Sequence, residues 1–189
     1  MDKFNLRRVA VAAAIALVSP LASATVLTFD DIGSDGFVPS NYGGLDWPAS
    51  TWPAYAGEQA PFSAHPGDYR ATVGWDGSVD TSAVSFLAAS TFDGAWFAGF
   101  EGVSVAFDLY YQGALVGSSA SLGLSGTSSF LSSGYAGLVD RVTIRSNDHA
   151  NFVMDDFTFS APVPEPESVL MMLAGLGLVG AAARRRKSA

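Results

Sequence analysis

Residues 103–111 constrain the fold more than any other stretch, because apolar side chains alternate there with small or polar ones. A period of two places the two sets on opposite faces of a β-strand. The dipeptide Gln112-Gly113 then predicts a tight turn, and residues 114–122 predict the second strand of a hairpin. This part of the chain is therefore expected to form antiparallel β-structure.

The same alternation recurs at residues 139–145, where Val142 and Ile144 are expected to face inward. Glycine, serine and Asn/Asp turns separate further β-like runs, and no helical pattern is convincing between residues 25 and 161. About eight short strands without a helix predict an all-β fold, an antiparallel β-sandwich. The other expected strands cover residues 25–29, 69–75, 83–86, 94–100 and 151–159.

The chain ends in three consecutive elements of different chemistry. Residues 162–166, with three prolines, predict an exposed, extended spacer, because proline neither completes a sheet ladder nor enters a helix interior. The uncharged residues 168–183 predict a C-terminal transmembrane helix of roughly 24 Å, short against a hydrocarbon layer of ~30 Å. Four cations follow and are expected to stay on the cytoplasmic side, which places the preceding domain outside. They are Arg184, Arg185, Arg186 and Lys187.

This order of elements resembles the PEP-CTERM sorting signal of Gram-negative bacteria. The resemblance implies that an exosortase-type membrane transpeptidase recognises the spacer, and that the chain passes transiently through the inner membrane. Cleavage near the motif would release the domain to the cell surface or an extracellular matrix. The alternative is an ordinary tail anchor that is never cut. The motif residues are Val163, Pro164, Glu165 and Pro166.

Residues 1–24 predict a secretory signal peptide, an N-terminal signal helix that precedes the sandwich. A positively charged start precedes an apolar core at residues 9–18, and Ala22 and Ala24 supply a small-residue cleavage site. Both ends of the chain are thus interpreted as targeting signals. The predicted organisation is a signal peptide at 1–24, a β-sandwich domain at 25–161 and a sorting signal at 162–189.

Charge limits the partners of the middle of the chain. Residues 25–167 carry three arginines (Arg70, Arg141 and Arg145) and 17 acidic residues, a net charge of −14. Such a surface repels phosphate backbones, so nucleic-acid binding is excluded. The chain has no cysteine, which excludes disulfides and thiolate zinc sites.

Four stretches of the domain resemble the jelly-roll domains common in PEP-CTERM proteins, which look like galactose-binding and carbohydrate-binding modules. The resemblance implies a jelly-roll topology and association with polysaccharide. The stretches that carry it are residues 27–31, 42–47, 94–97 and 152–159.

Two pairs of aspartates sit at the first and last expected strands. They are Asp30 with Asp31, and Asp155 with Asp156. First and last strands of jelly rolls are commonly neighbours, so the four carboxylates could converge. Strand parity groups Asp155 with Phe157 and the other apolar residues, and a carboxylate facing a core needs a cation or several donors. Ca²⁺, which prefers oxygen ligands, is the predicted structural ion. The alternative is that these acids sit at strand ends, where they cap turns or pair with Arg141 or Arg145.

Residues 37–69 form a long loop rich in aromatic residues and proline, and a loop of this length is often functional. Flat aromatic faces pack against the C–H surfaces of sugars, so Tyr42, Trp47, Trp52 and Tyr55 are candidate carbohydrate contacts. Packing over one end of the sandwich is the alternative for the same side chains.

No catalytic motif is present. Ser146, Asp148 and His149 are near neighbours on a turn, where they rarely orient one another as a triad requires. The sequence therefore predicts an exported, non-enzymatic protein of the cell surface or extracellular matrix, associated with exopolysaccharide or biofilm. One alternative function is a surface carbohydrate-active enzyme of glycoside hydrolase type, because two carboxylates suffice for hydrolysis. The other is a permanently anchored periplasmic binding protein.

Overall fold

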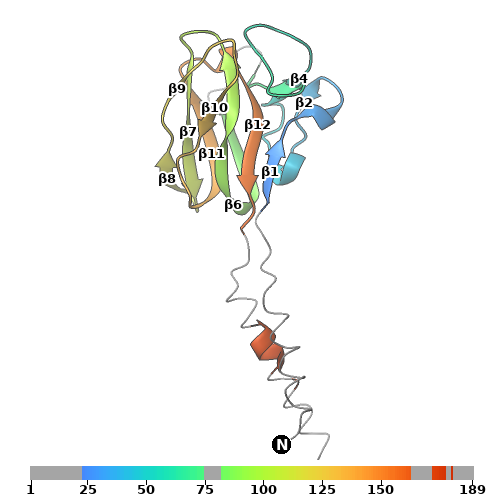
Figure 1. Ribbon diagram of the computed structural model, residues 1–189, viewed down its shortest axis with the longest axis vertical. Helices are drawn as coiled ribbons and strands as arrows, with labels where there is room; N and C mark the ends of the chain where they lie inside the picture. Colours follow the sequence, from blue (N-terminus) through green and yellow to red (C-terminus); the bar gives the residue numbers. More distant parts are fainter. Residues whose placement is uncertain (1–22, 75–81, 163–171, 178–179, 181–189) are drawn as a thin grey trace, which may run out of the picture. The chain divides into compact units, whose positions relative to one another are not determined.

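The structure is a computed structural model that describes residues 23–74, 82–162, 172–177 and 180 (Figure 1). Residues Ser23–Pro162 form one compact unit. Residues 172–177 and 180, outside that unit, are helical. None of the helices within the described ranges is long and apolar enough to cross a membrane. The rest of the span predicted at 168–183 lies outside the described residues, as does the predicted signal peptide up to residue 22.

The compact unit is built from β-strands and three short 3-10 helices, which agrees with the predicted all-β class. In chain order they are β1 (Ala24–Leu27), η2 (Asp30–Ile32), β2 (Gly36–Phe37), η3 (Tyr42–Gly44), β3 (Leu45–Asp46), β4 (Pro53–Tyr55), β5 (Arg70–Ala71), β6 (Ser82–Gly99), β7 (Ser104–Tyr111), β8 (Ala114–Ser118), β9 (Leu122–Gly123), β10 (Ser129–Ser132), β11 (Leu138–Ser146), η4 (His149–Asn151) and β12 (Phe152–Ser160).

All strand pairs are antiparallel and follow the order β2-β4-β5-β12-β6-β11-β7-β8. The 18-residue strand β6 belongs to two layers. Residues 82–85 and 90–91 of β6 pair with β11, and residues 91–99 pair with β12. The register against β11 shifts between Ser85 and Ser90, and the strand bends from one layer into the other (Figure 1). Because one strand serves both layers, the sandwich is a single hydrogen-bonded ladder.

The predicted hairpin is present. Strand β7 pairs with β8, Tyr111 lies opposite Ala114, and the turn residues Gln112 and Gly113 have φ angles of 51° and 80°. Positive φ at both central positions suits the twist of a two-residue hairpin. Strands β11 and β12 also lie where the alternation predicted them. The structure differs at β6, for which the sequence predicts two separate strands at residues 83–86 and 94–100. The exposed Leu87 and Ala88 interrupt the alternation between them, but the strand continues through both.

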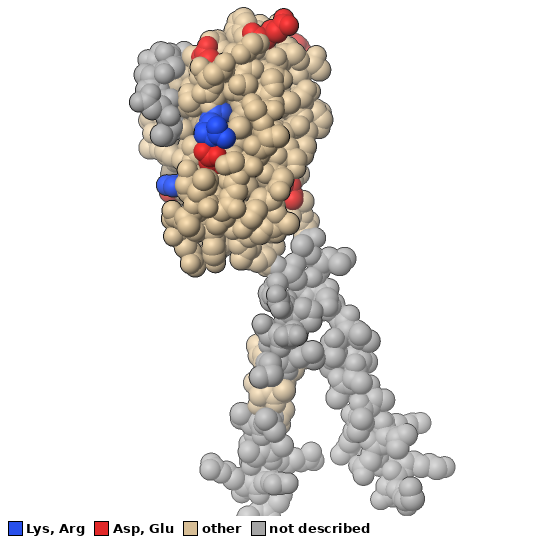
Figure 2. All heavy atoms as spheres, turned by 90° about the vertical axis from the view of Figure 1, so that its left-hand side faces the viewer, with Lys and Arg blue, Asp and Glu red and all other residues tan. Residues whose placement is uncertain are grey.

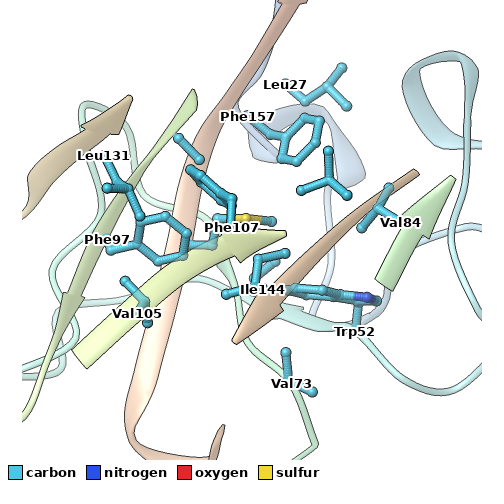
Figure 3. Close-up of a cluster of buried hydrophobic side chains, with 14 of the residues drawn as sticks. Leu27, Trp52, Val73, Val84, Phe97, Val105, Phe107, Leu131, Ile144 and Phe157 are labelled. Atoms are coloured by element: carbon cyan, nitrogen blue, oxygen red, sulfur yellow. The ribbon is translucent and has the colours of Figure 1, made fainter. Parts of the chain in front are cut away.

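Aromatic side chains from both layers fill the space between them (Figure 3). The ring of Phe107 on β7 lies 4.8 Å from that of Phe92 on β6, at an interplanar angle of 84°. Phe92 in turn stacks on Phe157 of β12 at 4.6 Å. Edge-to-face and offset contacts of this kind add about 0.5–1.5 kcal/mol each beyond the burial of apolar area. The chain has no disulfide, so this packing carries much of its stability.

Strand β12 contains a bulge that changes which face its side chains meet. Its register shifts between Asp155 and Thr158, and Asp156 has a φ of 46°. Met154 and Phe157 both enter the main core, while Val153 packs in a second cluster with Tyr55 and Ala98. The predicted parity, with Asp155 on the face of Phe157, is therefore wrong. A bulge adds a residue and reverses the alternation beyond it.

Candidate functional site

Most of the predicted addressing residues lie outside the described part of the chain. These are Ala22 at the N-terminal side and Val163, Pro164, Glu165, Pro166, Arg184, Arg185, Arg186 and Lys187 at the C-terminal side. Ala24 is described. It is the first residue of β1 and lies opposite Ser160, at the end of β12. The first and last strands of the domain are therefore paired.

The pairing of β1 with β12 brings three of the four predicted carboxylates to the segment that spans residues 65–69, but not as strand residues of one face. Strand β1 ends at Leu27, and Asp30 and Asp31 lie in the 3-10 helix η2, after Phe29 with a φ of 59°. Asp30 and Asp31 therefore do not lie on a strand. The turn into η2 allows Asp30 to reach residues 67–69, which lie almost forty positions along the chain.

The carboxylates hold this segment through its backbone. Asp30 Oδ1 accepts hydrogen bonds from the N–H groups of Asp68 (2.9 Å) and Tyr69 (3.0 Å), and Asp155 Oδ2 accepts one from His65 N–H at 2.6 Å. A Cβ at Gly67 (φ 111°) would come within 2.2 Å of the Asp30 carboxylate, so glycine permits the close approach. Asp30 and Asp155 thus cap backbone N–H groups, which is the role that the alternative to calcium binding gave to these acids.

His65 completes the arrangement. Its Nδ1 lies 3.0 Å from Oδ2 of Asp156, and its ring stacks on Trp96 with 3.3 Å between centroids. Sequence reasoning missed both His65 and Trp96. The register of β12 against β6, which places Trp96 opposite Asp155, is the signal that links them, and it depends on the bulge.

Burial raises the pKa of Asp155 from 3.8 to about 8, and the charges of Asp156 and Asp30 add to the rise. The N–H groups of His65 and Asp156 donate to this carboxylate and act in the opposite direction, with a smaller effect than burial. The side chain is therefore favoured in its protonated form within the folded domain.

This shift predicts a pH-dependent stability. In the unfolded chain Asp155 loses its proton near pH 4, whereas the folded domain retains it until about pH 8. The unfolded state therefore binds fewer protons between these values, so the contribution of Asp155 to stability is complete below pH 4 and declines up to pH 8. We expect the Tm of the protein to fall over this range and the decline in Asp155→Asn to be shallower. Equal slopes in thermal melts of the two proteins would contradict the assignment.

Calcium remains a prediction. The described residues include no group of three or more His, Cys, Asp or Glu side chains arranged to hold a metal ion. Asp31, the fourth predicted ligand, accepts a hydrogen bond from the hydroxyl of Tyr42. Burial and this contact raise the pKa of Tyr42 above its ordinary value.

The predicted sugar-binding aromatic residues are mostly internal. Trp47 and Trp52 are 0% and 1% exposed, and their rings meet at 5.5 Å. Tyr55 is 8% exposed, beneath the guanidinium of Arg70, and Tyr42 packs against the core at its margin. The prediction that Trp47 and Trp52 contact carbohydrate is therefore wrong, and packing explains them. The loop is also less irregular than expected, because β2, η3, β3 and β4 lie within it.

The turn with Ser146, Asp148 and His149 is organised for structure. Ser146 Oγ donates to the backbone carbonyl of Asp148 at 2.9 Å. The two oxygens of the Asp148 carboxylate accept from Ala150 N–H and from the side chain of Asn151. These bonds cap η4 and orient neither Ser146 nor Asp148 toward His149 as a triad would need.

A hollow of about 410 Å³ lies beside this turn. Strands β7 and β11 form its floor, and Ser121 and the turn from Ser146 to His149 form its walls. Sequence reasoning missed it because its residues come from separate segments. The alternation in β11 was a partial signal for the hollow, since it places Thr143 and Arg145 on the outer face of the strand and Val142 and Ile144 on the buried face.

Comparison with known proteins gives two kinds of result for the domain. No curated protein matches the chain. Solved structures of family 29 carbohydrate-binding modules are similar to it. One mutant of CBM29-2 covers 74% of this chain and 93% of its own, with 13% identity and a TM-score of 0.42. Another structure of a family 29 module covers 75% and 90%, with 13% identity and a TM-score of 0.43.

The C-terminal segment gives a specific result. A protein-family model matches residues 162–187, and this range includes the Pro-Glu-Pro element, the apolar segment and the basic residues together. This part of the chain is a PEP-CTERM protein-sorting motif.

Proposed function

We propose that this chain is an exported protein that an exosortase-type membrane transpeptidase delivers to the cell surface or extracellular matrix. The supporting observation is the sorting motif at residues 162–187. Its basic residues favour the cytoplasmic side of the inner membrane, so the domain would be held outside before cleavage. Processing near Pro164–Pro166 would then remove the apolar segment and release the domain.

The domain fits a binding role better than a catalytic one. In the turn 146–149, Ser146 bonds to a backbone carbonyl and Asp148 bonds to Ala150 and Asn151 rather than to His149. Asp155 and Asp156 are engaged with His65. In this proposal the mature protein associates with extracellular polysaccharide without cutting it, and contributes to an exopolysaccharide or biofilm matrix.

The delivery step can be tested by intact-mass measurement of the protein recovered from the culture matrix. We expect the mature form to lack Arg184–Lys187. Replacing Pro164, Glu165 and Pro166 together by alanine should keep the protein in the membrane fraction with its basic terminus intact. The matched control is Glu167→Ala, which removes a neighbouring acid and should be processed normally.

Two outcomes would contradict the proposal. Matrix protein that retains its terminal arginines would show release without cleavage. Wild-type protein found only in membranes, with an intact C-terminus, would instead identify a permanent anchor.

A further inference from the structure

The hollow over the paired strands β7 and β11 has the volume and the rigid floor of a small-molecule site. Its volume of about 410 Å³ lies within the range of ligand pockets. Its floor is rigid, because Val105 and Ile144 are buried in the core at 1% and 0% exposure. The side chain of Asn147 fixes the adjoining turn, accepting from Ser104 N–H at 2.8 Å and donating to the Gly102 carbonyl at 3.1 Å.

The walls offer hydrogen-bonding groups that suit a saccharide. The hydroxyl-bearing residues Ser104, Ser121 and Thr143 line the hollow. Among the described residues, none of these three hydroxyls makes a hydrogen bond. Each hydroxyl can donate or accept, as sugar hydroxyls do.

Arg145 provides the charge at this site. Its Nε lies 2.7 Å from Oδ2 of Asp108, and its side chain is 53% exposed. Asp108 is its only ion-pair partner among the described residues, and that contact uses one edge of the guanidinium fork. The terminal nitrogens can therefore bind a carboxylate in the paired geometry that guanidinium favours.

The absence of acids from the lining is unusual for this domain. Residues 25–167 include 17 acidic side chains, yet no Asp or Glu is among the described residues that line the hollow, which include Arg145 and His149. Charges are sparse across the face drawn in Figure 2, where most of the described surface is uncharged. Asp108, which is outside the lining, is paired with Arg145 at 2.7 Å, so a ligand carboxylate bound to the other edge of the guanidinium shares the arginine with this one acid. Each further carboxylate of a continuous polyanion would add repulsion from the acidic domain.

We propose that this hollow binds a saccharide unit that carries an isolated carboxylate, with Arg145 holding the carboxylate and Ser104, Ser121 and Thr143 holding ring hydroxyls. The inference rests on the proposed function, because an exported domain meets such polysaccharides outside the cell. The site is separate from the aromatic loop at residues 37–69, none of whose residues lines the hollow.

The test is calorimetric titration of the full chain, purified in detergent, with cellobiouronate and with cellobiose. These disaccharides differ only at C6 of one sugar unit, where a carboxylate replaces the hydroxymethyl group. We expect cellobiouronate to bind at least 10-fold more tightly than cellobiose, and rising NaCl concentration to reduce the difference. Arg145→Gln should abolish the preference, and Thr143→Val should weaken both ligands several-fold.

Arg141→Gln is the matched control. Arg141 is exposed on the same strand and face, but stacks over Tyr110 at 4.3 Å and does not line the hollow. Its loss should leave binding unchanged. Asp108 retains its bond from Ser118 Oγ (2.6 Å) in Arg145→Gln, so both variants should melt like the wild type.

Each other outcome overturns the inference. Equal binding of the two disaccharides would exclude carboxylate recognition, and an undiminished preference in Arg145→Gln would exclude this site. Absence of binding to both would exclude the ligand class. None of these results affects the delivery step, which the C-terminal mass decides separately.

Discussion

Replacing Trp47 with alanine is expected to lower the free energy of unfolding by about 3–5 kcal/mol, the range for truncating a large buried aromatic side chain. Trp47 is 0% exposed, and its ring contacts those of Phe29 at 5.7 Å, Trp52 at 5.5 Å and Phe157 at 6.0 Å. These partners come from three separate segments, so the cavity left by the indole cannot collapse by moving one of them. Urea unfolding followed by circular dichroism measures the change.

Leu87→Ala provides the comparison, because Leu87 is 67% exposed and its truncation should change stability by less than about 0.5 kcal/mol. The experiment also separates the two interpretations of the aromatic loop. If Trp47→Ala retained wild-type stability and lost affinity for a polysaccharide, the carbohydrate-contact prediction would be restored and the packing described here would be wrong.

The second large effect is expected for Gly94→Ala. Gly94 has a φ of 147°, and a Cβ there would lie 2.1 Å from the carbonyl oxygen of Leu131 on β10. Backbone strain and overpacking each cost about 1–3 kcal/mol, so the combined loss should be roughly 3 kcal/mol or more. The obstacle is a backbone atom, which cannot rotate away as a side chain can.

The control for this change is Gly36→Ala in β2. Gly36 is exposed, its φ is not in the left-handed region, and a Cβ there would have no neighbour within 4 Å. The Tm of the Gly36→Ala protein should remain close to that of the wild type. A Gly94→Ala protein that melts with the control would show that β10 does not lie against β6 as described.

The regular strands were predictable because their pattern is local. Alternation identified β7 and β11, and Gln112-Gly113 identified the hairpin turn. The bulge in β12 was not predictable, since Asp156 adopts a positive φ with no glycine to signal it. That one residue places Asp155 on the face opposite to Phe157, although β1 and β12 pair as expected and three of the four acids lie along residues 65–69.

The candidate site depended on contacts that no local pattern carries. Trp47 and Trp52 look alike whether they cover a core or face a sugar, and only the folded layers show that they are internal. Similarly, the hollow forms where β7, β11, Ser121 and the turn before η4 meet. The sorting motif was the opposite case, because its three parts are contiguous and in order.

The direction of β12 has a consequence for how the domain is presented. The strand carries the chain across the sandwich from Phe152 to Ser160, roughly 26 Å at about 3.3 Å per residue. Ala24 lies opposite Ser160, so the chain enters and leaves the domain at one pole (Figure 1). His149 and Ser146 precede β12 and therefore belong to the other pole. A domain tethered through its C-terminal side would hold the hollow at the far tip, a full sandwich length beyond the point of attachment.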